Sequence, residues 1–349
     1  MRITAVATAF PDHYYAQDEL LLTLKRQWGD RLGNVAVLER LHRRLGVEGR
    51  HLALPVEQYE TMRTWGAAND AWIETATRLG ARAVGAALER AGPPPADIGT
   101  IVFASVTGVA SPSIDARLVN RLGLRPNIRR LPLFGLGCVA GAAAVARAAD
   151  VVRAYPDEAA IVVAVELCSL TWQRDDLSIA NLISAGLFAD GAAAVVIAGR
   201  GGEGRGPEIV ATRSIFYPDT EKVMGWRISE RGFQVMLSPD VPTVIRRHLG
   251  GDVDAFLADH RLRRADIQRW ILHPGGPKVL VAATEALALP PDSLARSWEC
   301  LRRAGNLSSV SVLMVLQEVA RHDPPPAGAW GLLAAMGPGF CSELVLLRW

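Results

Sequence analysis

The stretch LPLFGLGCVAGAAAVARAADVVR, residues 131–153, decides the fold class. It opens on an apolar segment, Arg130–Phe134, that we interpret as a β-strand, and it continues through a turn with two glycines. It ends in an alanine-rich segment, Cys138–Arg153, whose composition favours a helix. A buried strand that leads into a long helix is typical of α/β proteins. The stretch therefore predicts an α/β fold with Cys138 at the start of a helix.

The same alternation of strands and helices continues on both sides of this stretch. A stripe of apolar residues at helical spacing runs from Trp72 to Leu88, and the glycine and prolines at 92–95 end that helix. Further helices are expected at 114–122 and 176–186. The strands are almost continuously apolar, which is typical of a sheet covered on both faces. They are Ile3–Phe10, Thr100–Val106, Ile161–Val165 and Ala192–Ala198.

A glycine-rich segment, Gly199–Gly206, has the composition of a flexible linker, and beyond it the order of elements recurs. The expected strands of this second part are Glu208–Ser214, Phe233–Leu237, Trp270–Leu272, Trp330–Ala335 and Glu343–Leu347. The expected helices are Pro242–Leu257, Val279–Ala288 and Leu307–Val319. We therefore divide the chain into two similar halves, residues 1–200 and 207–349.

Two short segments occupy matching places in the two halves. Gly137-Cys138 stands at a helix start in the first half, and Gly305-Asn306 stands at one in the second. A pseudo-twofold axis between the halves would bring these helix starts together. We therefore expect Cys138 and Asn306 to lie close to each other.

Composition excludes several classes of function. The chain has 349 residues, of which 50% are hydrophobic and 21% charged, so it is long and apolar enough for a large core. The formal net charge is only +2, which argues against binding nucleic acid. The four cysteines are far apart and form no metal-binding or disulfide pattern, so we expect no metal and a reducing, cytoplasmic setting.

Cys138 is the first candidate for chemistry. The N–H groups and the dipole at a helix start favour the thiolate, which is the nucleophilic form of cysteine. The flanking glycines leave the sulfur approachable. Two alternatives remain for this motif: a small buried core cysteine, and a dinucleotide-binding turn. The glycine spacing is one residue too long for the dinucleotide fingerprint, and no acidic residue follows at the required distance.

His273 and Asn306 are the other two candidates. Ile271-Leu272 is an apolar strand end that delivers His273 into a Pro-Gly-Gly turn, and strand ends are where α/β sheets present catalytic groups. His273 can pair with a Cys138 thiolate as an imidazolium or act as a neutral donor. Asn306 can supply a fixed amide donor to an oxyanion, or it can be an ordinary helix N-cap.

Taken together, these motifs resemble the type III polyketide synthase family, also called chalcone synthase-like. The resemblance rests on the cysteine followed by Val-Ala-Gly, on the His-Pro-Gly-Gly turn and on Gly-Asn-Leu-Ser-Ser at 305–309. It also rests on LFADGAA at 187–193 and GPGF at 337–340, and it covers nearly the whole chain. Two departures are Ala189, where the family usually has glycine, and Met336, where phenylalanine is common.

The resemblance implies the thiolase fold, with two similar halves layered α-β-α-β-α, and a homodimer. It implies that Cys138 accepts an acyl group from an acyl-CoA starter and that malonyl-CoA loses CO₂ to give an enolate that attacks this thioester. His273 and Asn306 would hold the thioester carbonyl and stabilise the enolate oxygen. CoA thioesters are then substrates, and no metal, nicotinamide or pyridoxal cofactor is required.

The resemblance also assigns binding residues. The positions that match the family's cavity are Thr107, Cys168, Thr171, Phe188, Gly225, Val235 and Ser308. The positions that match its CoA-binding cations are Arg43, Arg44, Arg50 and Lys278. The segments 224–228 and 237–242 are most similar to bacterial members that extend fatty acyl starters into alkylpyrones and alkylresorcinols. Small residues at Thr107, Cys168 and Val235 would leave room for such a chain.

Three alternatives stay open. A synthase that uses malonyl-CoA alone, of the tetrahydroxynaphthalene type, can also carry a cysteine at 168, although Val106 and Ser184 stand where those enzymes tend to have cysteine. A ketosynthase that joins chains bound to acyl carrier protein would use the same three residues, but the His-Pro-Gly-Gly turn disfavours the ketoacyl synthase III group. A silent partner subunit would usually have lost the cysteine, and Cys138 is present.

Overall fold

The computed structural model describes residues 1–91, 94–200 and 206–349. In these ranges the largest sheet has nine strands, in the order β11-β12-β13-β8-β1-β7-β6-β4-β5. Its first five strands along the chain are β1 (Arg2–Ala9), β4 (Ile98–Ala104), β5 (Arg129–Leu133), β6 (Ala159–Leu167) and β7 (Asp190–Ala198). The other four are β8 (Glu208–Phe216), β11 (Ile267–Leu272), β12 (Trp330–Gly337) and β13 (Cys341–Arg348). Two small sheets accompany it, β2 (His13–Ala16) with β3 (Gly49–Leu52), and β9 (Met224–Ser229) with β10 (Gly232–Leu237).

The large sheet consists of two leaves that share a single residue pair, Arg2 with Glu208. In the first leaf β1 runs antiparallel to β7, β7 antiparallel to β6, and β6 parallel to β4. In the second leaf β8, β13, β12 and β11 repeat this order with the same relative directions. The two halves of the chain therefore have the same topology, as the recurring order of elements predicted.

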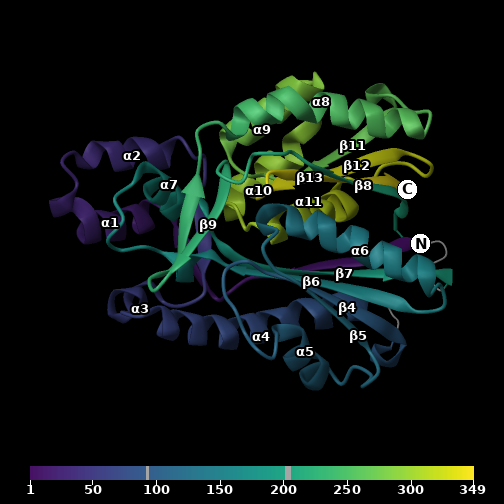
Figure 1. Ribbon diagram of the computed structural model, residues 1–349, viewed down its shortest axis with the longest axis horizontal. Helices are drawn as coiled ribbons and strands as arrows, with labels where there is room; N and C mark the ends of the chain where they lie inside the picture. The colour runs from purple at the N-terminus through teal and green to yellow at the C-terminus, as the bar shows by residue number, and fades with distance from the viewer. Residues whose placement is uncertain (92–93, 201–205) are drawn as a thin grey trace.

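Helices cover both leaves and fill the space between them (Figure 1). The helices of the first half are α1 (Gln17–Trp28), α2 (Val35–Arg43), α3 (Val56–Thr61), α4 (Trp65–Ala91), α5 (Ile114–Leu122), α6 (Ala140–Ala154) and α7 (Ile179–Leu187). Those of the second are α8 (Val241–Asp259), α9 (Pro277–Leu287), α10 (Ala295–Ala304) and α11 (Ser309–His322). Helices α4 and α5 lie outside the first leaf, α8 and α9 lie outside the second, and α6 and α11 lie between the leaves. This is the α-β-α-β-α arrangement expected of the thiolase fold.

The central helices can pack closely because their facing residues are small. About half of helix α6 is alanine, and ten of its fifteen residues are buried. At Gly141 an added Cβ would lie 2.1 Å from the carbonyl oxygen of Ser309, so only glycine allows the two helix starts to approach this far. The sequence thereby fixes the distance between the two segments that carry Cys138 and Asn306.

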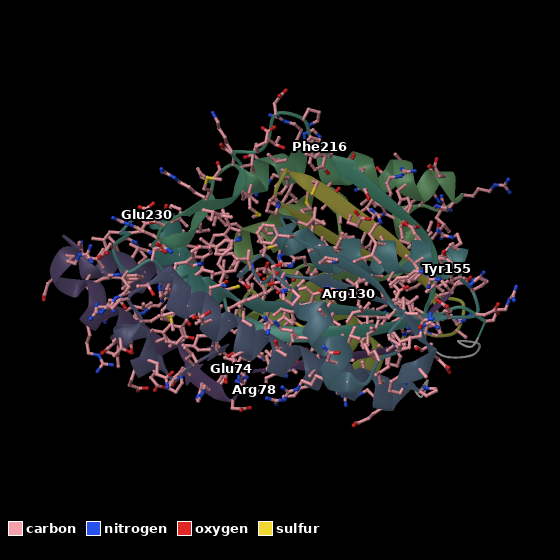
Figure 2. All side chains as sticks on the ribbon, turned by 60° about the horizontal axis from the view of Figure 1, so that its bottom comes forward. Glu74, Arg78, Arg130, Tyr155, Phe216 and Glu230 are labelled. Atoms are coloured by element: carbon pink, nitrogen blue, oxygen red, sulfur yellow. The ribbon has the colours of Figure 1, made fainter. Side chains whose placement is uncertain are left out.

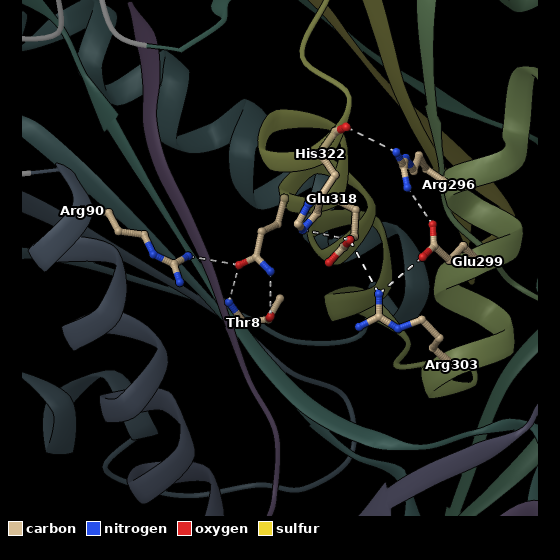
Figure 3. A network of polar contacts seen from close by, with 8 residues as sticks. Thr8, Arg90, Arg296, Glu299, Arg303, Glu318 and His322 are labelled. Carbon is tan, nitrogen blue, oxygen red and sulfur yellow. Dashed lines mark hydrogen bonds and ion pairs between the residues drawn. The ribbon is translucent and has the colours of Figure 1, made fainter.

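Polar contacts tie the far end of α11 to both halves (Figure 3). Gln317 accepts from the backbone N–H of Thr8 at 2.9 Å and donates to the Thr8 hydroxyl at 3.0 Å, which joins α11 to β1. On the other side Glu318 lies 3.7 Å from Arg303 of α10 and 3.6 Å from His322. Because Gln317 and Glu318 are buried, these contacts satisfy groups that would otherwise lack partners in the core.

Most of the expected elements are present within a few residues of their predicted bounds. The sequence analysis did not identify the helices α1, α2, α3 and α10 or the strands β2, β3 and β9. The predicted linker at 199–206 lies largely outside the described residues, as do positions 92 and 93 of the predicted helix stop. In the ranges that the structure describes, none of the helices is both long enough and apolar enough to cross a bilayer.

Candidate active site

The nucleophile segment follows the end of β5. Gly135 and Gly137 have φ of +89° and +53°, a region that other residues rarely adopt, and they turn the chain sharply into a 3₁₀ turn at Gly137–Val139 and then into α6. Cys138 lies in this turn with 6% of its surface exposed. Its thiol donates to the Ser308 hydroxyl across 3.6 Å, and Ser308 precedes α11. The helix starts of the two halves therefore meet, as predicted.

His273 follows β11, the matching parallel strand of the second leaf. Its backbone N–H donates to Ala334 in β12 at 3.0 Å, which fixes the chain direction where the strand ends. The imidazole is buried, and its Nδ1 has no hydrogen-bond partner among the described residues. Burial lowers the pKa of His273 to about 3, so an isolated imidazole here is neutral and has an N–H to donate.

Asn306 is held in one orientation by its neighbours. Its Oδ1 accepts from the backbone N–H of Ser308 at 2.8 Å and from the Ser311 hydroxyl at 3.4 Å. Its Nδ2 therefore faces the other way, where one hydrogen goes to the carbonyl of Gly275 at 3.0 Å. The amide thus links the α11 start to the turn after His273, and its second N–H hydrogen stays available. Asn306 is a fixed donor rather than a simple N-cap.

The environment of Cys138 opposes the free thiolate. Burial raises the pKa of the thiol to about 12, while the Ser308 hydroxyl and the Asn306 amide, which can donate to a thiolate, act in the opposite direction. Burial therefore works against the thiolate that the helix start favours. A partner that takes the proton within the same buried site would help the thiol to ionise.

A buried cluster of hydrogen bonds around the carboxyl group of Glu166, which the sequence analysis missed, lies behind Cys138. Glu166, at the end of β6, accepts from Val106 N–H at 3.1 Å, from the Thr107 hydroxyl at 2.9 Å and from the Ser309 hydroxyl at 2.6 Å. Burial raises its pKa to about 7, and its charge raises the pKa of Cys138. In the sequence, this cluster was indicated by a single acidic residue near the end of an apolar strand.

A cavity of about 500 Å³ opens onto the three candidate residues. Cys138, His273 and Asn306 all line it, together with the cavity residue Phe188. Met336 and Phe340 close one wall, so the departure at 336 changes the cavity surface. Arg44 and Lys278 also line the cavity and are exposed, which places two of the predicted CoA-binding cations at its mouth. Arg43 is exposed, and no contact assigns it to the cavity.

Three predicted cavity residues have other contacts. The Thr107 hydroxyl belongs to the Glu166 cluster and also accepts from Trp72 Nε1 at 3.2 Å and Leu167 N–H at 2.9 Å. The Cys168 carbonyl accepts from the Thr171 hydroxyl at 2.7 Å, and burial raises the pKa of the Cys168 thiol well above its usual range. Thr171 lines a second cavity of about 370 Å³.

The prediction that Arg50 binds CoA is wrong. Its side chain is fully buried, and it donates from Nη1 to the carbonyl of Phe188 at 2.5 Å and from Nε to Gln17 at 3.1 Å. Burial lowers the pKa of Arg50 to about 10, and the nearby carboxyl group of Asp190 acts in the opposite direction. Arg50 also packs against Gly305, where an added Cβ would lie 3.1 Å from it. It therefore supports the segment that carries Asn306 and has no surface to offer a phosphate.

The hairpin register places Gly225 on the face opposite the hairpin residues that line the cavity, contrary to its assignment to the cavity wall. Directly paired residues in an antiparallel hairpin lie on one face, and faces alternate along each strand. Leu237 pairs with Met224, and both line the cavity, so Trp226 and its partner Val235 share their face. Gly225 pairs with Met236 on the opposite face. A large indole, and not a glycine, therefore stands beside Val235.

A cysteine at the start of one central helix, with a histidine and an asparagine from the other half of a five-layered fold, defines a condensing enzyme of the thiolase type. The chain belongs to the chalcone and stilbene synthase family, the type III polyketide synthases. Residues 2–201 match the N-terminal domain of chalcone and stilbene synthases, and residues 208–349 match their C-terminal domain. Enzymes of this kind are acyltransferases that condense malonyl-CoA with loss of CO₂, so the predicted family and enzyme class are confirmed.

Bacterial members are similar to this chain over its whole length. It is 51% identical to 1,3,6,8-tetrahydroxynaphthalene synthase of Streptomyces peucetius subsp. caesius, over 99% of this chain and 93% of that protein. It is 31% identical to phloroglucinol synthase of Pseudomonas fluorescens, over 97% of each. The crystal structure of 1,3,6,8-tetrahydroxynaphthalene synthase from Streptomyces coelicolor A3(2) has a TM-score of 0.95 at 31% identity and covers 100% of this chain and 99% of that one.

Proposed function

We propose that this enzyme condenses malonyl-CoA alone, without an added starter, into an aromatic polyketide of the tetrahydroxynaphthalene type. The observation that carries the proposal is the 51% identity, over 99% of the chain, to a 1,3,6,8-tetrahydroxynaphthalene synthase. The hairpin register adds to it, because a large indole, Trp226, pairs with Val235, beside which the sequence analysis expected room for a fatty acyl chain. The argument from Val106 and Ser184 against this product carries less weight than likeness along the whole chain.

Each step of this chemistry has a group in the site. The Cys138 thiolate attacks the carbonyl of a CoA thioester, and the CoA thiol leaves, so the acyl group is held on sulfur. A second malonyl-CoA then loses CO₂, and its enolate oxygen takes hydrogen bonds from the neutral His273 imidazole and the free Asn306 amide hydrogen. The enolate carbon attacks the Cys138 thioester and releases the thiolate. Arg44 and Lys278 at the mouth supply positive charge for the phosphates of CoA.

A second candidate is the extension of fatty acyl starters to alkylpyrones or alkylresorcinols, with either CoA or acyl carrier protein as the donor. The observation that favours it is the apolar surface that α2, α7 and α8 present to the cavity, which includes Leu41, Ile183 and Ile245. An aliphatic chain would be buried there at a gain of about 25 cal/mol for each Å² removed from water.

A starter series separates the two candidates. Purified enzyme is incubated with malonyl-CoA alone and with malonyl-CoA plus starters from acetyl-CoA to stearoyl-CoA, and the products are identified by mass spectrometry. The Cys138→Ala variant serves as the blank. We expect an aromatic product from malonyl-CoA alone. Product only in the tubes with a long-chain starter would overturn the proposal in favour of the second candidate. The same series with acyl carrier protein thioesters tests the donor.

A further inference from the structure

Gln173 joins the first half of the chain to the β9–β10 hairpin. It lies between the 3₁₀ turn Cys168–Thr171 and α7, and its side chain is 8% exposed. Its Nε2 lies 3.1 Å from each of three backbone carbonyls, those of Thr171, Arg231 and Phe233. The carbonyl of Arg231 belongs to the turn of the hairpin, and that of Phe233 belongs to the beginning of its second strand, β10. The two amide hydrogens therefore serve three acceptors, and two of the three lie on the hairpin.

The hairpin tip is also held by apolar contacts. Glu230, in the turn, stands at the molecular surface (Figure 2). Gly232 has φ of +82°, and an added Cβ there would lie 2.5 Å from Trp65, so the turn is pressed against α4. Phe233 is buried, with its ring centroid 6.2 Å from that of Trp65 and 6.4 Å from that of Phe134. These apolar contacts hold Phe233, and Gln173 binds the polar backbone beside it.

The position of this hairpin determines the shape of the cavity. Met224 and Leu237 line the cavity of Cys138. Trp226 and Val235 lie on the same face of the hairpin, two residue pairs closer to the tip. A movement at the Phe233 end therefore carries Trp226 and Val235 with it, because all of them belong to one paired ribbon. Cys138, His273 and Asn306 lie on other elements and keep their places.

We propose that Gln173 is a positioning residue that sets the wall of the polyketide cavity and thereby the number of malonyl units joined before the product leaves. The inference rests on the proposed function. Loss of the amide leaves carbonyls at the hairpin tip without this donor. Because an unsatisfied buried carbonyl is costly, the tip would shift towards positions where these carbonyls find a new donor. A displaced wall changes which chain lengths fit and leaves the loading of Cys138 unchanged.

The test compares product ratios among matched variants. Gln173→Leu replaces the amide by an apolar side chain one atom shorter and removes its donors. Gln173→Glu places a carboxylate against three carbonyl oxygens. Gln173→Asn keeps the amide on a shorter stem and should lie between these variants and the native enzyme. Gln234→Leu is the control, because Gln234 lies in the same hairpin on the opposite face. Each protein is incubated with malonyl-CoA, products are quantified by mass spectrometry, and acyl loading of Cys138 is read from the intact mass.

We expect the ratio of the full-length aromatic product to shorter lactones to change by roughly fivefold or more in Gln173→Leu and Gln173→Glu. An unsatisfied buried carbonyl costs at least about 1 kcal/mol, which corresponds to a change of about fivefold. Loading of Cys138 should stay within about twofold, a difference well below 1 kcal/mol, and Gln234→Leu should match the native ratio. An unchanged ratio in Gln173→Leu, or a fall in loading and product together with the ratio preserved, would overturn the inference. If the native enzyme forms no product from malonyl-CoA alone, the proposed function fails, and the same variants are compared by extension number on the starter it does accept. If Gln173→Leu does not fold, Gln173→Asn decides by the same ratio.

Discussion

Replacing Glu166 by glutamine should make the stability of the protein less sensitive to pH. Glu166 is fully buried and receives hydrogen bonds from one backbone N–H and from the hydroxyls of Ser105, Thr107 and Ser309. Glutamine has the same shape, and hydroxyl groups can rotate to receive its N–H hydrogens as well as to donate. The substitution therefore removes a titrating group from the core and keeps the packing.

The expected magnitude follows from the pKa of the Glu166 carboxyl. Burial raises it from 4.5 to about 7, and each tenfold change in proton affinity corresponds to about 1.4 kcal/mol. The ionised carboxylate is thus less favourable in the folded than in the unfolded chain by about 3 kcal/mol. This penalty is absent below pH 4.5 and complete above pH 7, so native stability falls as pH rises through this window. The glutamine variant lacks the penalty.

Urea unfolding followed by tryptophan fluorescence at pH 5 and pH 8 tests this reasoning. We expect the free energy of unfolding of the variant, relative to the native protein, to rise by about 2.5 kcal/mol between these pH values, because part of the effect is already present at pH 5. Glu158→Gln is a control that should show almost no pH dependence in this window, since hydrogen bonds from Arg125 and Arg129 lower the pKa of that carboxyl and move its titration below pH 5. A Glu166→Gln difference that does not depend on pH would refute the argument from burial.

Four further outcomes follow from the site. Cys138→Ala should show no acyl mass increment with any CoA thioester, and an increment at another residue would contradict the role of its sulfur. Asn306→Ala should slow condensation about 10²-fold, as for other oxyanion donors, while Cys138 still loads; normal turnover would contradict it. Gly141→Ala should lower the melting temperature and condensation together, because its Cβ would lie 2.1 Å from the carbonyl of Ser309. In His273→Ala the alkylation rate of Cys138 should rise at a higher pH than in the native enzyme, because the proton acceptor is missing; coincident profiles would show that His273 acts only as a neutral donor.

The site residues that could be predicted from the sequence are those whose neighbours in the chain indicate a turn. Cys138, His273 and Asn306 each stand beside glycines and at the end of an apolar strand or the start of a helix, so nearby residues alone reveal that each is presented at a chain turn. The strands β6 and β7 were equally clear, because they are buried along their whole length and contain long apolar runs, Ile161–Val165 and Ala192–Ala198.

What escaped prediction depends on contacts between distant segments. Arg50 looks like a surface cation in sequence, and only the fold encloses it between Phe188, Gln17 and Gly305. Gly225 and Trp226 are neighbours, and a shift of one residue in the hairpin register exchanges the side chain that faces the cavity. Glu166 gave a weak signal, because its role appears only when Val106, Thr107 and Ser309 converge on it from other elements.

The pKa values of Cys138 and His273 explain why neither residue would serve alone. Burial holds the thiol pKa at about 12 and the imidazole pKa at about 3, because each charge taken singly is poorly solvated there. Both residues line the same cavity, so transfer of the thiol proton to the imidazole would place two opposite charges in one buried site, and their attraction would counter part of the desolvation of each. The same lack of water protects the Cys138 thioester from hydrolysis, and it strengthens the hydrogen bonds that Asn306 and His273 offer to an enolate. The burial that makes the resting thiol unreactive therefore also makes the site suited to joining carbon atoms, provided that the cysteine and the histidine ionise together.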